Sequence, residues 1–140
     1  MDWRREVSEA DFEERVLAAS HSRPVLVDIG ADWCGPCRVL APRLERLAHE
    51  YAGAFLLANV DADENMRLAG RHKVRGFPTV VAYSRGAEVA RFHSAQTDGF
   101  LRRFIDDVLR RHAAAPAATE APAAAVSQAA PAGAAARSVK

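Results

Sequence analysis

The sequence contains two cysteines, Cys34 and Cys37, and only two residues separate them. They lie in the string Trp33-Cys34-Gly35-Pro36-Cys37, which follows a short apolar run and precedes a long amphipathic segment. A disulfide between them would close a very small ring, and in the chain-entropy model the stabilisation by a disulfide grows with loop length. The spacing is therefore more typical of a catalytic or metal-binding pair than of a structural crosslink.

The position of the pair favours dithiol chemistry. A thiolate at the N-terminus of a helix faces unpaired backbone N–H groups and the positive end of the helix dipole, which lower its pKa. We expect Cys34 at that end, as the nucleophile, and Cys37 nearly one turn inside. Cys37 would then be the resolving thiol that attacks a mixed disulfide formed by Cys34. Pro36 suits the first turn of a helix, where its missing N–H is not needed.

A zinc half-site is the competing interpretation of the pair. Zinc usually takes four protein ligands in a structural site, commonly from a second Cys-x-x-Cys or from paired histidines. The five histidines are scattered and none pairs at ligand spacing: His21, His49, His72, His93 and His112. We therefore expect no bound metal.

A second chemical signal is Asp28, a carboxylate inside the apolar run Val25-Leu26-Val27-Asp28-Ile29. Burying a carboxylate is costly and raises its pKa. Asp28 lies six residues before Cys34, just upstream of the expected helix. From the residues alone, two interpretations stay open: a proton acceptor or relay for Cys37, and an aspartate at a strand end that reaches solvent.

The apolar pattern predicts the elements that position these residues. They are a helix over about 8–20, a strand over 25–29, a helix over about 34–51, a strand over 55–60, a helix over 64–71, a hairpin of strands 80–83 and 88–93, and a last helix capped by Thr97. The strand–helix–strand unit 25–60 favours a right-handed parallel crossover. The order predicts a mixed sheet with helices on both faces.

Composition divides the chain into two parts. Residues 113–140 hold 15 of the 30 alanines and three prolines, with Val126 and Val139 as the only larger apolar residues. Such a segment cannot bury enough surface to offset the entropy of ordering. We expect one domain over residues 1–112 and an Ala/Pro-rich disordered tail over 113–140.

Charge and hydropathy set further expectations. The net charge is +1, so no strongly basic surface for nucleic acid is expected. No apolar run approaches the roughly 18 residues of a membrane-spanning helix, and the first residues lack the apolar core of a secretory signal. We expect a cytoplasmic monomer without nucleic-acid or membrane partners.

Together these residues resemble the thioredoxin family, from about Ser8 to His112. The pieces that carry the resemblance are Val25-Leu26-Val27-Asp28, Ala31-Asp32-Trp33-Cys34-Gly35-Pro36-Cys37-Arg38, Ala41-Pro42, Asn59-Val60-Asp61 and Val74-Arg75-Gly76-Phe77-Pro78-Thr79. The resemblance implies an α/β thioredoxin fold, a central mixed sheet flanked by four α-helices. It also implies that Cys34 attacks, that Cys37 resolves and that Asp28 is the buried carboxylate assisting Cys37.

The resemblance further implies a substrate-docking surface. Pro78 would be a cis-proline that faces the cysteines, and the backbone of Phe77 would pair with a substrate strand. The other residues implied in docking are Trp33, Gly35, Pro36 and Gly76.

The implied function is reduction of protein disulfides by dithiol–disulfide exchange. The chain would bind no cofactor itself, and a thioredoxin-reductase-like flavoprotein using NADPH would supply electrons for disulfide-containing client proteins. One alternative is a thioredoxin-fold binding module or chaperone-like subunit with dispensable cysteines, but the presence of both cysteines argues against it. The other is a disulfide isomerase or oxidase, although the Gly-Pro dipeptide between the cysteines resembles the reducing members.

The sequence also departs from the family pattern. Gly30 stands where an aromatic residue is usual, and Leu57 stands where a lysine commonly neighbours the buried carboxylate. Without that lysine we expect desolvation to raise the pKa of Asp28 further. Phe77 replaces the usual Ile or Val, and His93-Ser94-Ala95 replaces Val-Gly-Ala in a loop bordering the substrate groove. These changes favour a specialised range of clients.

Overall fold

The computed structural model describes residues 2–114, which form one five-stranded sheet with helices on both faces. The strand order is β1-β3-β2-β4-β5. The strands are β1 (Arg4–Glu6), β2 (Val25–Gly30), β3 (Leu56–Asp61), β4 (Thr79–Ser84) and β5 (Ala87–His93). Strands β1, β3 and β2 run parallel, whereas β4 is antiparallel to β2 and to β5. The sheet is therefore mixed, as predicted.

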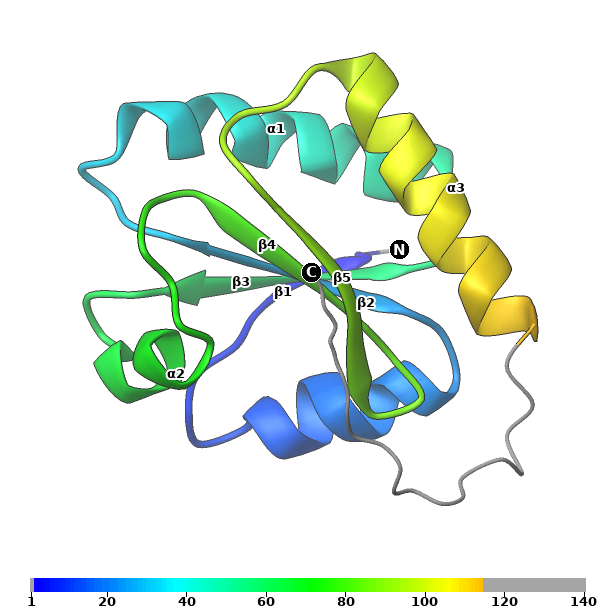
Figure 1. Ribbon diagram of the computed structural model, residues 1–140, viewed down its shortest axis with the longest axis horizontal. Coiled ribbons are helices and arrows are strands. Elements are labelled where there is room, and N and C mark those ends of the chain that lie inside the picture. Colours follow the sequence, from blue (N-terminus) through cyan, green and yellow to red (C-terminus); the bar gives the residue numbers. More distant parts are fainter. Residues whose placement is uncertain (1, 115–140) are drawn as a thin grey trace.

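Four helical segments cover the sheet. The first is a π-helical segment η1 (Glu13–Ala18) that continues as a 3₁₀ turn η2 (Ala19–His21), and the others are α1 (Gly35–Glu50), α2 (Met66–Arg71) and α3 (Asp98–Ala114). Helices α1 and α3 cover one face, and the N-terminal helical segment and α2 lie on the other (Figure 1). Alternate residues of β2 accordingly enter two separate cores, with Val25 and Val27 in one and Leu26 in the other. Within residues 2–114, no helix has the length and apolarity needed to cross a membrane.

The structure differs from the expected elements at three places. Strand β1 was not predicted, because Arg-Arg-Glu has no strand pattern; backbone bonds to β3 hold it at the sheet edge. The first helix begins at Glu13, since Ser8–Asp11 forms a turn in which the Asp11 carboxylate accepts from the Ser8 N–H at 2.8 Å. Helix α3 extends to Ala114, two residues beyond the expected domain boundary. Residues 115–140 of the predicted tail lie outside the described residues.

Trp3, just before β1, packs onto the turn after α1. A Cβ at Gly53 would lie 2.6 Å from the Trp3 ring, and Gly53 has a φ of +81°. Arg23 joins this contact: its guanidinium lies 5.8 Å from the Trp3 ring centroid and donates to the Gly53 carbonyl at 3.0 Å. Glycine is therefore required here by both backbone conformation and space.

Replacing Gly53 by alanine should destabilise the protein by about 1–3 kcal/mol, from the positive φ and the overlap with Trp3. Urea unfolding of the two proteins measures the difference. Gly70→Ala is the matched control, because Gly70 lies within α2 and a Cβ there meets nothing within 4 Å. That control should leave stability unchanged or raise it by up to about 1 kcal/mol. Equal stabilities for Gly53→Ala and the parent would contradict the close packing of Trp3 on Gly53.

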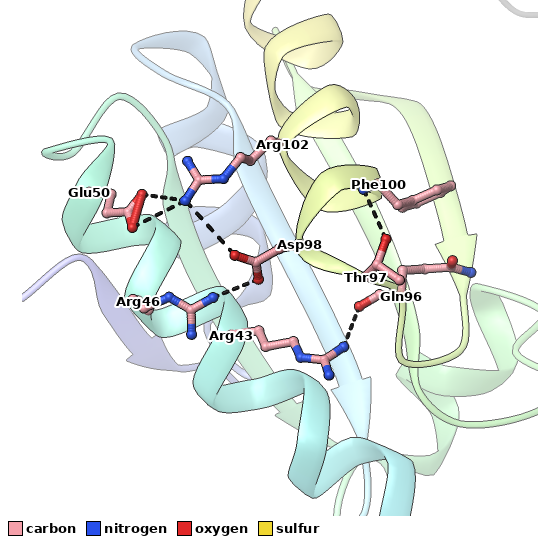
Figure 2. A network of polar contacts seen from close by, with 8 residues as sticks. All are labelled: Arg43, Arg46, Glu50, Gln96, Thr97, Asp98, Phe100 and Arg102. Carbon is pink, nitrogen blue, oxygen red and sulfur yellow. Dashed lines mark hydrogen bonds and ion pairs between the residues drawn. The ribbon is translucent and has the colours of Figure 1, made fainter.

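A polar network joins the start of α3 to α1 (Figure 2). The Asp98 carboxylate lies 2.6 Å from an Arg46 guanidinium nitrogen and 3.9 Å from one of Arg102. Arg43 donates to the carbonyl of Gln96 at 2.6 Å. These contacts attach the segment between β5 and α3 to the helix that begins at the cysteines.

Local hydrogen bonds also hold the segment between β5 and α3. The Phe100 N–H donates to the Thr97 hydroxyl at 3.2 Å, so Thr97 caps α3 as predicted. The side chain of Gln96 donates to the His93 carbonyl at 2.7 Å. The loop that follows β5 is therefore fixed at both ends.

Candidate active site

Cys34 and Cys37 are joined by a disulfide at the start of α1, with their Cα atoms 5.3 Å apart. Cys34 is the N-cap of α1, and its sulfur accepts from the Cys37 N–H at 3.2 Å. Gly35 and Pro36 form the exposed first turn between them. The predicted placement of the two sulfurs at a helix N-terminus is therefore correct. Cys34 is 5% exposed and Cys37 is 8% exposed. The two cysteines therefore differ in their position on the helix and not in their exposure.

Two aromatic side chains flank the disulfide. Trp33 is 65% exposed, and its indole N–H donates to the Asp63 carboxylate at 2.9 Å. Phe77 packs against the cluster that contains both cysteines. The rings of Trp33 and Phe77 meet edge to face with centroids 5.7 Å apart. The two rings thus form an apolar surface on one side of the reactive pair.

The segment before β4 adds unpaired backbone to this surface. The Phe77–Pro78 peptide bond is cis, as the resemblance implies. Neither backbone polar group of Phe77 is hydrogen-bonded to another backbone group within residues 2–114, which leaves both free for an extended substrate segment. Gly76 is exposed, and its carbonyl accepts from the Thr79 hydroxyl at 2.8 Å.

Asp28 lies on the face of β2 that α1 covers, and it is 5% exposed. One carboxylate oxygen has no hydrogen-bond partner among the described residues, and the other accepts weakly from the Asn59 amide at 3.4 Å. Burial raises the pKa of Asp28 to about 7, and the positive charge of Arg4 opposes that rise. Desolvation thus has the effect expected from the sequence.

Asp28 and Cys37 line the same hollow, which has a volume of about 250 Å³. Gly30 also lines it, and a Cβ at Gly30 would lie 2.9 Å from the Cys37 sulfur. The absence of a side chain at Gly30 therefore allows the sulfur to approach the strand closely. The buried carboxylate and the Cys37 sulfur therefore line one common hollow.

Comparison with known proteins agrees with this geometry. The thioredoxin family model matches residues 4–107, which include all these residues. The chain belongs to the thioredoxin family. It is 40% identical over 103 residues to a thioredoxin of Acidithiobacillus ferridurans, covering 74% of this chain and 94% of that one. It is 46% identical over 83 residues to a thioredoxin of Thiocapsa roseopersicina, covering 59% and 88%. Against the mitochondrial thioredoxin of Mus musculus it is 36% identical over 99 residues, covering 71% of this chain but only 58% of the relative.

Family membership and the cysteine pair together define the activity. The chain is a dithiol–disulfide oxidoreductase of the protein-disulfide reductase type, and the structure holds its redox couple in the oxidised form. The alternatives, a binding module with dispensable cysteines and a disulfide isomerase or oxidase, are not favoured by these relatives. Within residues 2–114, no three His, Cys, Asp or Glu side chains are grouped so as to hold a metal ion.

One expectation about the thioredoxin site is wrong. Leu57 does not neighbour Asp28: it pairs with Leu26 and is buried in the core beneath α1. The residue beside Asp28 in the register of β2 and β3 is Asn59, two positions further along the strand. Leu57 and Asn59 face the same side of the sheet, so only the register distinguishes them. The neighbour of the carboxylate is therefore a neutral amide.

Sequence reasoning also missed two other residues at the site. The sequence assigns no role to Asp63, yet its carboxylate accepts from the indole N–H of Trp33. The second residue is Arg4, which lies in β1, a strand without a recognisable strand pattern. Arg4 lines the hollow of Asp28 and is the cation whose charge acts on that carboxylate. No sequence pattern predicts either contact, because 30 residues separate Trp33 from Asp63 and 24 separate Arg4 from Asp28.

Removing the charge of Arg4 should raise the pKa of Asp28 above its value of about 7, because nothing then opposes desolvation. NMR titration of the Asp28 carboxyl in Arg4→Met measures the change. Arg5→Met is the matched control, since alternation along β1 places Arg5 on the opposite face of the sheet. An equal pKa in Arg4→Met and the parent would show that Arg4 does not act on this site.

Proposed function

We propose that this chain reduces the disulfides of client proteins in the cytoplasm, with electrons from an NADPH-dependent, thioredoxin-reductase-like flavoprotein. The observation that carries the proposal is the Cys34–Cys37 couple at the N-terminus of α1, beside the unpaired backbone of Phe77. A cytoplasmic location suits this activity, because that compartment keeps thiols reduced.

The exchange proceeds in two steps. In the reduced protein, the Cys34 thiolate attacks one sulfur of a client disulfide; a mixed disulfide forms and the other client sulfur leaves as a thiolate. The Cys37 thiolate then attacks Cys34, which closes the Cys34–Cys37 disulfide and releases the second client sulfur. Two client thiols are gained as the protein dithiol is oxidised, and two electrons from the flavoprotein restore the dithiol.

The surroundings support this division of roles. The N-terminus of α1 stabilises a thiolate on Cys34. Cys37 lies inside the first turn and shares its hollow with Asp28, whose pKa near 7 suits it to accept the Cys37 proton. The free N–H and C=O of Phe77 can hold the client segment as an added strand next to Cys34.

Insulin reduction tests the proposal. With NADPH and a thioredoxin reductase, the full chain should precipitate the insulin B chain while absorbance at the NADPH band falls. Repeating the assay with dithiothreitol in place of NADPH and the reductase tests whether the chain reduces insulin independently of the flavoprotein. The couple should have a reduction potential near the about −270 mV of thioredoxins rather than the about −180 mV of disulfide isomerases. A value near the latter would favour the isomerase, and cell fractionation tests the location.

A further inference from the structure

A groove of about 460 Å³ extends from the reactive surface along one end of the sheet. Its walls are the loop 73–78 before β4 and the end of β5, residues 91–94. Phe77 belongs to both this groove and the surroundings of the disulfide. A client segment paired with the backbone of Phe77 would therefore place its flanking residues in the groove.

Positive charge dominates the groove. Lys73 and Arg75 are exposed, and neither nitrogen group lies within 4.0 Å of a carboxylate in residues 2–114. Arg91 is different, because Glu88 binds its guanidinium at 2.6 and 2.8 Å. None of the residues that line the groove is acidic. The groove thus carries two unpaired cations, although the whole chain has a net charge of only +1.

Hydrogen bonds join the two walls of the groove. The Thr79 hydroxyl donates to the Gly76 carbonyl at 2.8 Å, so the Nδ1–H of His93 donates to the Thr79 oxygen at 3.1 Å. The Ser94 N–H donates to the Pro78 carbonyl at 3.1 Å. Lys73 and Arg75 are therefore displayed on a preformed surface, which lowers the entropic cost of binding a client.

We propose that this groove selects client proteins with Asp or Glu beside the target disulfide, which Lys73 and Arg75 attract. The inference rests on the proposed function, since it names the substrate class of the same site. An acidic peptide fits better than a nucleic acid, because two cations are too few for the roughly 6–10 phosphate contacts that such binding typically uses. The proposed preference rests on the unpaired Lys73 and Arg75, not on the replacements at His93 and Ser94.

Three synthetic peptides test the proposal. They share one intramolecular disulfide and differ in two flanking residues, which are Glu-Glu, Gln-Gln or Lys-Lys. The full chain is reduced with dithiothreitol and desalted, and the second-order rate constant for each peptide is measured by chromatography. At low salt the acidic peptide should react about fivefold faster than the neutral one, as two exposed ion pairs of ~0.5 kcal/mol each allow. At about 0.5 M salt the preference should shrink, because screening shortens the range of these charges.

Charge-reversal variants assign the effect to the groove. In Lys73→Glu/Arg75→Glu, the Lys-Lys peptide should become the preferred substrate. Arg103→Glu/Arg110→Glu changes the net charge equally, but on exposed positions of α3 outside the groove, and should keep the preference for Glu-Glu. If the first variant does not fold, Lys73→Gln and Arg75→Gln should each reduce the preference.

The outcomes separate the two proposals. Equal rates for all three peptides, or a preference that survives the groove variant, would overturn acidic selection while leaving disulfide reduction intact. If the α3 variant loses the preference to the same extent, the preference depends on net charge, and the proposed role of the groove is overturned. Failure to reduce any peptide would instead contradict the proposed function.

Discussion

Replacing Cys37 by serine should convert the protein into a trap that accumulates mixed disulfides with its substrates. Cys34 keeps its place as the N-cap of α1 and can still attack, but no second thiol is present to release the client. Turnover of insulin should fall by several orders of magnitude, because the two sulfurs act as a unit. Intact-mass spectrometry of the reduced variant mixed with a disulfide peptide should detect one covalent adduct per chain.

Cys34→Ser is the matched comparison. It should lose turnover to the same extent and form no adduct, since Cys37 lies inside the helix and shares its hollow with Asp28 rather than capping α1. An adduct on Cys34→Ser and none on Cys37→Ser would exchange the two roles. Turnover or a cellular role that survives replacement of both cysteines would instead support a binding module.

The reactive pair could be placed from the sequence because its signals are local. A buried strand, a short turn and a helix start lie within about ten residues of one another, and each has its own pattern. Pro36 in the first turn and Thr97 at the start of α3 are positions that backbone chemistry alone favours. Such features depend only on residues that are close in the sequence.

The surroundings of Asp28 could not be placed in this way. Its neighbour depends on the register of β2 against β3, and Leu57 and Asn59 satisfy the same alternation. Only the packing of Leu57 beneath α1 decides between them. Arg4 reaches the site through β1, an edge strand of three polar residues held by backbone bonds. Long-range register and edge pairing are tertiary effects that a hydrophobic pattern does not contain.

Replacing Asp28 by asparagine should change how the stability of the oxidised protein depends on pH. The pKa of Asp28 is about 7 in the folded protein and 3.8 as a free group. Between these values the folded state holds a proton that the unfolded state has lost, so stability falls as pH rises. At about 1.4 kcal/mol per unit, the loss from pH 3.5 to pH 8 is about 4 kcal/mol.

Asp28→Asn removes this titration. Its stability relative to the parent should therefore rise by about 4 kcal/mol between pH 3.5 and pH 8, whatever constant cost the new amide brings. Urea unfolding at both pH values gives the two differences. Asp11→Asn is the control, and its stability relative to the parent should change with pH in the opposite direction. The reason is that a backbone hydrogen bond from Ser8 lowers the pKa of Asp11. That carboxylate stabilises the fold above its unfolded pKa, and the contribution is lost as the pH falls.

The same substitution distinguishes a functional carboxylate from one that is merely buried. If Asp28 accepts the Cys37 proton, Asp28→Asn should slow the release of client from the mixed disulfide, while the first attack by Cys34 keeps its rate. A gain in stability at pH 8 together with slower resolution would mean that the protein tolerates an unstable buried charge because its chemistry uses it. A gain in stability with unchanged resolution would leave Asp28 without a role in proton transfer. The two measurements are independent, because one follows the folded state and the other follows a single step of the exchange.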